Sequence, residues 1–381
     1  MEIHQINPAK TRMVDQFLRL PFHIYEDNPF WVPPLMMDEK RRFNFHKYSF
    51  YKHSEAAFFI GWNGKEASGR LAILNNKLYN DHNSEKTAFF YLFECQNEPE
   101  TAIGLFQAGK EWARSQGLNK ILGPKGFTAL DGFGLLVEGF EHRPAMGIPY
   151  NPPYYSSLLE GIGFSSVSES VSGYLDASMN FPERIHELSK RIQARRGLTV
   201  ARFKSRKSLK VLIPKLKDLY NGALVGTEGG IPLTDEDVNS LADQILWFAD
   251  PTLIKIIEKK DPQNPKYKQM VGFLLAYPDI SAALQKTKGY LFPFGWISIL
   301  FELKKTDWIN INGAGLIKEY QGLGGTALLF SEMYKSVVES GQFRRADIVQ
   351  IGLENQKMMR EMVNFGIHFY KTHRIYQLLL D

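Results

Sequence analysis

The feature that most constrains this chain is a glycine-rich hexamer, Gln321-Gly-Leu-Gly-Gly-Thr326, between an apolar run and a helical pattern. Residues 308–316 predict a buried strand, and residues 326–339 repeat apolar side chains at helical spacing until Gly341. Glycines let backbone N–H groups approach a ligand closely, and a helix N-terminus adds unpaired donors and a partial positive charge. The unit is therefore a candidate pyrophosphate site, and a plain turn with packing glycines is the alternative.

The glycine spacing separates this hexamer from two common nucleotide-binding loops. It matches neither G-x-x-x-x-G-K-[ST] nor G-x-G-x-x-G, which disfavours a P-loop kinase and a Rossmann dinucleotide site. The chain has no G-x-S-x-G elbow. His368 and His373 lie five residues apart without a carboxylate-rich neighbourhood, so we expect no metal site.

The length of 381 residues exceeds what one hydrophobic core usually organises, so two domains are expected. We place the first at residues 1–178, a connecting helix at 179–197, and the second at 198–381. The net charge of +5 suits a polyanionic small molecule and is too small to indicate a nucleic acid partner.

The chain begins without a signal-peptide pattern, and no apolar stretch approaches the roughly 20 residues that span a bilayer. Its single cysteine, Cys95, follows an apolar run and is expected to be a buried small hydrophobe, which fits a reducing compartment. We therefore expect a cytoplasmic protein with no membrane partner.

The two halves repeat one order of elements, which predicts an α/β (α+β) fold of two tandem units. In the first half we expect a helix from 7 to 20 stopped by Pro21, strands at 56–62, 71–78 and 87–93, a helix at 98–116, a strand at 120–122, a loop at 123–149, a helix at 151–163 and a strand at 167–175. In the second half we expect strands at 198–203, 252–258, 270–277, 308–316 and 346–353, and a final strand or hairpin at 367–379. We also expect helices at 209–224, bent or broken by Pro214, and at 234–248, 326–339 and 355–365. We interpret this as a diverged internal duplication, with unrelated glycine-capped helices as the alternative.

The hexamer and its surroundings resemble a known family. Gln321-x-x-Gly324-x-Thr326, with Glu319-Tyr320 before it, resembles the coenzyme A loop of the GNAT superfamily of N-acetyltransferases. The downstream strand, Asn355 and a helix ending at Gly366 are also similar. These motifs cover residues 308–376, and the element order extends the likeness back to residue 198. Each unit would then be a mixed, mostly antiparallel sheet flanked by helices.

This resemblance implies acetyl-CoA or coenzyme A as co-substrate. The backbone around the end of the strand would bind the pantetheine arm and polarise the thioester carbonyl, and Asn355 would support coenzyme A, which is compatible with a plain N-cap role. The implied binding residues are Leu316, Gln321, Gly322, Leu323, Gly324, Gly325, Thr326 and Asn355.

The chain departs from the family pattern where catalysis is concerned. Met362 stands where the family often has the tyrosine that protonates the leaving thiolate. Tyr370 is a candidate replacement and Glu228 a candidate base, while a core role and a plain loop role are the alternatives. Thr326 and Lys318 also replace the residues usual at their positions.

The first half has no such loop, since the strand at 87–93 leads into Asn97-Glu-Pro-Glu100, whose acidic residues would repel a pyrophosphate. A tandem of one working and one degenerate unit resembles N-myristoyltransferase and the Fem-type aminoacyltransferases. Residues 21–34 and 151–155 resemble segments of a group of uncharacterised bacterial proteins. The aromatic segments 25–34 and 150–155 line either an acceptor cleft or a core.

The sequence therefore predicts an acyl-CoA-dependent N-acyltransferase, an enzyme that transfers an acetyl group to a small-molecule or peptide amine. A Fem-like aminoacyltransferase and an inactive binding protein of the same fold are the alternatives.

Overall fold

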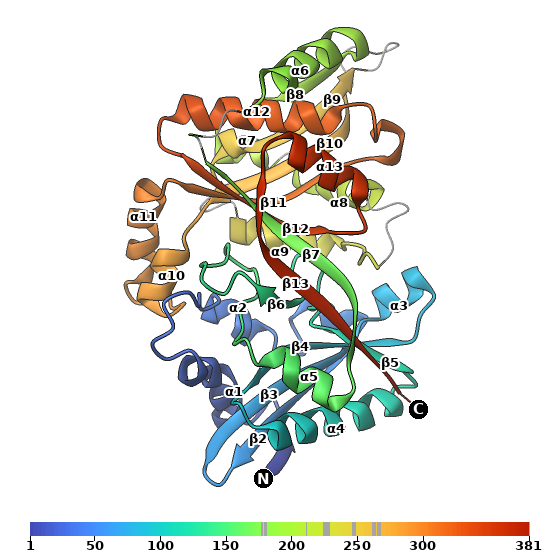
Figure 1. Ribbon diagram of the computed structural model, residues 1–381, viewed down its shortest axis with the longest axis vertical. Helices are drawn as coiled ribbons and strands as arrows, with labels where there is room; N and C mark the ends of the chain where they lie inside the picture. The colour runs from blue at the N-terminus through green and yellow to red at the C-terminus, as the bar shows by residue number, and fades with distance from the viewer. Residues whose placement is uncertain are drawn as a thin grey trace.

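The computed structural model of the protein describes residues 1–176, 178, 181–210, 212–223, 229–245, 249–260, 264 and 268–380. Their strands form one thirteen-stranded mixed sheet in the order β1-β2-β3-β4-β5-β13-β7-β12-β11-β10-β9-β8, with β6 paired to β13. Figure 1 shows the first half at the bottom and the second at the top, joined by two long strands. The predicted mixed, mostly antiparallel α/β architecture is confirmed.

Each half contributes its elements in chain order. The first half holds β1 (Glu2–Gln5), α1 (Thr11–Ile24), α2 (Met36–Arg41), β2 (Glu55–Asn63), β3 (Glu66–Asn75), α3 (Lys77–Asn83), β4 (Thr87–Cys95), α4 (Pro99–Ser115), β5 (Lys120–Gly123), β6 (Leu135–Glu138), α5 (Tyr155–Ile162) and β7 (Ser165–Asp176). The second half holds α6 (Glu183–Arg196), β8 (Leu198–Ala201), α7 (Arg206–Leu209), α8 (Ile213–Ala223), α9 (Asp235–Ile245), β9 (Ile254–Lys260), β10 (Lys268–Pro278), α10 (Ser281–Thr287), α11 (Gly295–Lys305), β11 (Trp308–Leu316), α12 (Gly325–Ser340), β12 (Arg345–Gly352), α13 (Gln356–Asn364) and β13 (His368–Leu379).

The two halves exchange strands at the centre of the sheet. In each half a parallel pair is followed by a helix and a long strand: β4 and β5 precede α5 and β7, while β11 and β12 precede α13 and β13. The strand of one half then pairs with the sheet of the other, because β13 lies beside β5 and β7 lies beside β12. The domain boundaries predicted at residues 178 and 198 stay a prediction. The sheet of each half continues into a strand of the other half.

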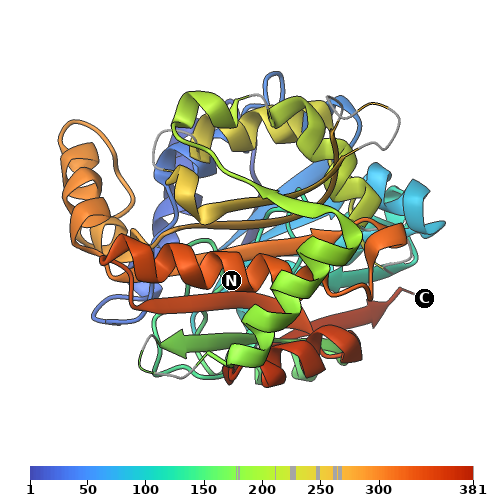
Figure 2. The same ribbon diagram turned by 90° about the horizontal axis from the view of Figure 1, so that it is seen from above.

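Helices cover the sheet on both faces. In the first half, α4 and α5 cover a core that includes Leu71, Phe90 and Phe106, and α1 covers the other face over Phe17 and Phe58. In the second half, α12 and α6 pack over a core that includes Ile311, Leu328, Phe330 and Met362. Figure 2 shows α12 and α6 crossing above the sheet.

Two predictions about the first half are wrong. The helix does not stop at Pro21, because α1 continues to Ile24. Pro21 lacks the N–H that would bond the carbonyl of Phe17, and the Arg70 guanidinium donates to that carbonyl instead, at 3.0 Å. The expected loop at 123–149 contains β6, which pairs with β13 from the far end of the chain. No local sequence pattern indicates this pairing.

No helix among the described residues is both long and apolar enough to cross a bilayer.

Candidate active site

The candidate site begins where β11 and β12 part. These parallel strands pair from Trp308 and Arg345 to Ile311 and Ile348 and then diverge. Beyond that point β11 pairs only with β10 among the described strands, while β12 stays paired with β7. One edge of β11 over residues 312–316 therefore stays unpaired among the described residues and faces an opening between β11 and β12. We call this opening the notch.

Both strands are irregular where they separate. In the β10–β11 ladder, Asn312 is the extra residue between the pairs Ala276–Ile311 and Leu275–Gly313. In the β12–β7 ladder the register shifts between Ile348 and Ile351, and Gln350 has a φ of +46°. Such bulges bend and twist a strand, so the two irregularities account for the divergence that opens the notch.

The glycine loop follows directly on β11. Gly322 and Gly324 have φ values of +73° and +85°, a conformation that favours glycine, and Gly324 is the N-cap residue of α12. Among the described residues, no side chain caps this helix N-terminus. A Cβ on Gly325 would lie 2.7 Å from the Leu316 side chain, so the loop packs tightly on the strand end. The Gln321 side chain fixes the loop further, because its Nε2 donates to the carbonyl of Leu316 at 3.1 Å.

Helix α13 contributes the other wall of the notch. Asn355 caps this helix, since its side-chain oxygen accepts the N–H of Met358 at 3.1 Å, and the same residue lines the cavity described below. The N-cap role is therefore confirmed. Lys357 lies over the glycine loop, with its ammonium 2.8 Å from where a Cβ on Gly322 would lie. Its position in the first turn after Asn355 is the only sequence signal that could have singled it out.

A cavity of about 850 Å³ extends from the notch into the first half. Of the residues implied by the resemblance, Leu316, Gln321, Gly322, Thr326 and Asn355 line it. Leu323, Gly324 and Gly325 lie in the loop but not on the cavity wall.

Of the two predicted catalytic residues, the structure describes only Tyr370, and it does not line this cavity. The hydroxyl of Tyr370 donates to Asp347 at 2.6 Å, and the Lys371 ammonium donates to Tyr370 at 2.8 Å, away from the cavity wall. Burial raises the pKa of Tyr370 and of Asp347, the latter to about 6, and lowers that of Lys371 to about 8. Glu228 lies outside the described residues.

Met362, at the expected tyrosine position, is fully buried and lines the cavity. A different phenol stands at the notch. Tyr277 on β10 lines the cavity, and the Asn312 side-chain amide, at the bulge, donates to its hydroxyl. Burial raises the pKa of Tyr277, so its hydroxyl keeps its proton at neutral pH. The sequence did not single out Tyr277, because its contact with Asn312 depends on how β10 pairs with β11.

The far end of the cavity is polar and buried. Arg42 forms ion pairs with Asp131 at 2.7 Å and Glu39 at 2.9 Å. Arg70 and Glu94 form a second pair at 3.6 Å. All five side chains line the cavity.

Three atoms of this cluster, Glu39 Oε2, Arg42 Nη1 and Arg70 Nε, have no hydrogen-bond partner among the described residues, although Arg42 Nη1 forms the ion pair with Glu39 Oε1. Since buried polar groups are normally bonded, these atoms are available to a polar ligand.

The sequence of the chain is distantly similar to two curated proteins along nearly its whole length. Protein YghO of Escherichia coli (strain K12) is 24% identical over 370 residues, which cover 95% of this chain and 91% of the relative. The bacterial ceramide synthase of Caulobacter vibrioides (strain NA1000 / CB15N) is 25% identical over 383 residues, which cover 98% and 97%. No protein-family profile matches the chain.

Among solved structures, the chain is similar to a tandem GNAT protein from the clavulanic acid biosynthesis pathway, solved without AcCoA. The TM-score is 0.57 at 11% identity, and the match covers 100% of this chain and 98% of that one. The strand exchange, the parted parallel strands and this full-length match agree. The chain has the fold of the tandem GNAT N-acetyltransferases, as the resemblance of its glycine loop predicts.

Proposed function

We propose that the protein is an acyl-CoA-dependent N-acyltransferase. The acyl-CoA donor binds in the notch, and the acceptor amine binds in the part of the cavity that the first half of the chain lines. One observation carries the proposal: the parted strands end in an uncapped helix N-terminus with the Lys357 ammonium beside it. The unpaired backbone groups of a free strand edge can hydrogen-bond the amides of a pantetheine arm. The unpaired N–H groups of a helix N-terminus, together with an ammonium group, can bind a pyrophosphate.

Acyl transfer here needs a polarised carbonyl, a positioned amine and a proton for the leaving group. The neutral amine attacks the thioester carbonyl carbon and the C–N bond forms, the nitrogen loses a proton to a base, the C–S bond breaks, and the thiolate takes up a proton from an acid. In this proposal, backbone N–H groups of residues 312–316, at the free edge of β11, polarise the carbonyl, and Tyr277, which lines the cavity, supplies the proton to the thiolate. Glu228 stays a prediction for the base.

The acceptor end favours an amine with a polar head and an apolar body. Glu39 offers a buried carboxylate oxygen to an ammonium or hydroxyl group, and aromatic and aliphatic residues such as Tyr91, Phe133 and Leu135 line the path toward the notch. The Caulobacter relative is named for making ceramide, an N-acylated long-chain amino alcohol. We therefore propose a long-chain amino alcohol as acceptor. The sequence predicts acetyl-CoA as the donor. The cavity is also large enough for a longer acyl-CoA.

Two measurements test the proposal. Titration calorimetry with coenzyme A tests the notch, and release of free thiol from acetyl-CoA and palmitoyl-CoA in the presence of amines tests the reaction. Amine-dependent thiol release with a long-chain amino alcohol supports the proposal. The absence of both binding heat and a thermal shift would remove the donor assignment, whereas binding without turnover across an amine panel favours the inactive alternative.

A further inference from the structure

A part of the second half that the proposed reaction does not use carries an exposed aromatic surface. Residues 280–305 comprise α10, α11 and the segment between them, which we call the aromatic lobe. Figure 2 shows the two helices projecting sideways from the body of the molecule. The exposed fractions of Phe292, Phe294 and Phe301 are 75%, 72% and 70%, and Tyr290, Trp296 and Leu300 are each at least 40% exposed.

This surface differs from the rest of the described chain, where the other exposed large hydrophobic residues are scattered over separate elements. The lobe has a small core of its own, made by Ile280, Ala283, Leu284 and Ile299. Its fold therefore does not need the exposed phenylalanines. A gathering of exposed aromatic side chains on one projection marks an interaction site.

The charge of the lobe indicates what kind of partner fits. It contains four lysines, Lys286, Lys288, Lys304 and Lys305, and one acidic residue, Glu302. All four lysines are exposed, and none forms an ion pair with another described residue. Protein interfaces are depleted in lysine, whereas aromatic residues next to lysines are typical of segments that lie in the headgroup region of a bilayer.

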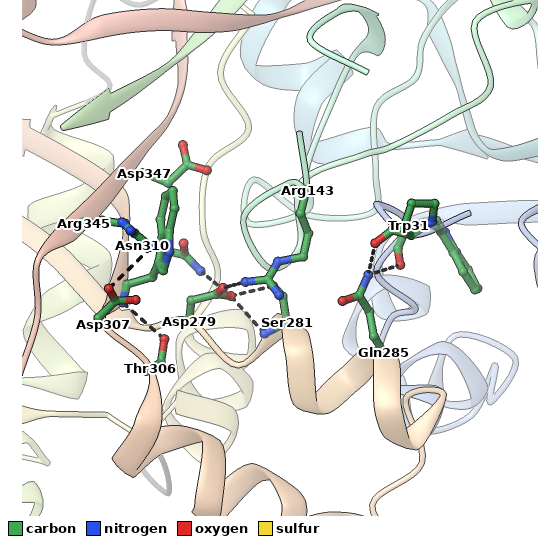
Figure 3. A network of polar contacts seen from close by, with 12 residues as sticks. Trp31, Arg143, Asp279, Ser281, Gln285, Thr306, Asp307, Asn310, Arg345 and Asp347 are labelled. Atoms are coloured by element: carbon green, nitrogen blue, oxygen red, sulfur yellow. Dashed lines mark hydrogen bonds and ion pairs between the residues drawn. The ribbon is translucent and has the colours of Figure 1, made fainter. Parts of the chain in front are cut away.

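The base of the lobe is held firmly, as Figure 3 shows. Asp279 precedes α10 and pairs with Arg143 from the first half at 2.7 Å, while Ser281 donates to the same carboxylate. Gln285 on α10 donates to the carbonyls of Pro29 and Trp31 at 2.8 and 2.9 Å. The exposed aromatic residues therefore project from a fixed base, which lowers the entropy lost when they bind a surface.

The lobe also adjoins the cavity. Val32, Leu35 and Met146 pack against its small core, and the same three residues line the cavity together with Leu284. A surface that covers the lobe would therefore lie beside the cavity wall.

From these observations we infer that the aromatic lobe docks the protein on a bilayer that contains anionic phospholipid. The phenylalanines enter the headgroup region and the four lysines face the negative surface. Docking goes beyond the proposed acyl transfer and does not rest on it. The sequence predicts no membrane partner because no segment spans a bilayer, but surface docking needs no spanning helix.

Vesicle flotation tests the inference with the full chain. The probes are vesicles of phosphatidylcholine alone and vesicles of equal parts phosphatidylcholine and phosphatidylglycerol. We expect the protein to float with the anionic vesicles, and less with the neutral ones. The triple change Phe292→Ser, Phe294→Ser, Phe301→Ser should weaken binding at least about tenfold, because three exposed aromatic side chains no longer bury apolar area.

Matched variants separate the lobe from general surface effects. Lys304→Glu with Lys305→Glu should weaken binding to anionic vesicles at least about tenfold and abolish its salt dependence. Lys10→Glu with Lys47→Glu, and Val338→Ser with Val363→Ser, change exposed residues elsewhere and should leave binding unchanged. Thermal unfolding of each variant checks that the fold is retained.

Three outcomes would overturn the inference. The first is a wild-type protein that stays unbound to anionic vesicles, and the second is a folded phenylalanine variant that binds them as well as the wild type. The third is a wild-type dimer in sedimentation velocity that the phenylalanine changes dissociate, together with no flotation, because the lobe would then bind a second copy of the chain.

Discussion

Among single residues, Lys357 has the most direct bearing on ligand binding. Its ammonium lies beside Gly322, and it has no ion-pair partner among the described residues. The structure also limits how the loop itself is tested. A Cβ at Gly324 would lie 2.3 Å from the side chain of Ile192, and its φ is +85°, so a substitution there disturbs the fold as well as binding.

We predict that Lys357→Ala weakens coenzyme A binding about tenfold or more, because a charged hydrogen bond to phosphate contributes roughly 1.5–3 kcal/mol. Titration calorimetry measures the change. Lys318→Ala removes an exposed lysine from the adjacent turn and should leave the affinity unchanged. Equal affinities for the Lys357 variant and the wild type would show that the ammonium does not reach the phosphates.

We predict opposite effects for substitutions of the two candidate tyrosines. Tyr277→Phe should lower kcat roughly ten- to a hundredfold with little change in KM, because the hydroxyl at the notch would no longer protonate the thiolate. Tyr370→Phe should instead lower the melting temperature and leave kcat nearly unchanged, since its hydroxyl bonds Asp347 and Lys371. Steady-state kinetics and thermal unfolding of both variants distinguish the roles, and the reverse pattern would favour Tyr370.

Asp347 should give a distinct pH dependence of stability. Burial raises its folded-state pKa from 3.8 to about 6, so the folded protein holds a proton that the unfolded chain releases. Its contribution to the unfolding free energy therefore falls as pH rises from about 4 to 6, by up to about 3 kcal/mol. Denaturant unfolding of the wild type and of Asp347→Asn over this range measures the effect. The difference between the two should change with pH, and a constant difference would contradict the prediction.

At the scale of elements, the notch depends on how the strands pair, and less on the types of residue that they contain. The sequence predicts strand 308–316 with the bounds that the structure gives β11, and the loop and the following helix almost as closely. It does not predict that Asn312 is an extra residue in the ladder. A bulge is set by two strands together, and the partner lies more than thirty residues away in sequence, so no local pattern specifies it.

Strand β13 offers a direct test of strand exchange. Its end pairs with β5, from Tyr376 beside Gly123 to Leu379 beside Lys120. We predict that truncation after Ile375 makes the amides of β5 and β4 exchange faster, because β5 becomes an edge strand and the buried Tyr376 is lost from the first core. Hydrogen exchange measures this. Amides of β9 and β10, at the other end of the sheet, serve as the internal control, and unchanged exchange in β5 would count against the pairing.

At the scale of the whole molecule, the two halves form one structure through β7 and β13. The cavity likewise has one end in each half, with the notch in the second and the Arg42–Asp131 pair in the first. A ligand that fills it contacts both halves, so the units are joined both by the sheet and by the site.

We predict that residues 1–178 expressed alone do not reach the stability of the first half in the full chain. The fragment would expose β5 and β7 where β13 belongs, and unpaired strand edges promote aggregation. Circular dichroism, thermal unfolding and sedimentation of the fragment test this, with the full chain as reference. A monomeric fragment with a cooperative transition as high as that of the full chain would show that the first half is an independent domain.

The amino-acid sequence by itself determined most of the strands, the helices that follow them, the glycine loop and the repeated order of the two halves. These follow from apolar periodicity, glycine conformations and helix caps, all of which act over a few residues. Only the tertiary structure decided the exchange of β7 and β13, the neighbours Lys357 and Tyr277 of the notch, and the buried partners of Tyr370. Those contacts join residues that are distant along the chain, and their geometry depends on how strands pair and twist in the assembled sheet.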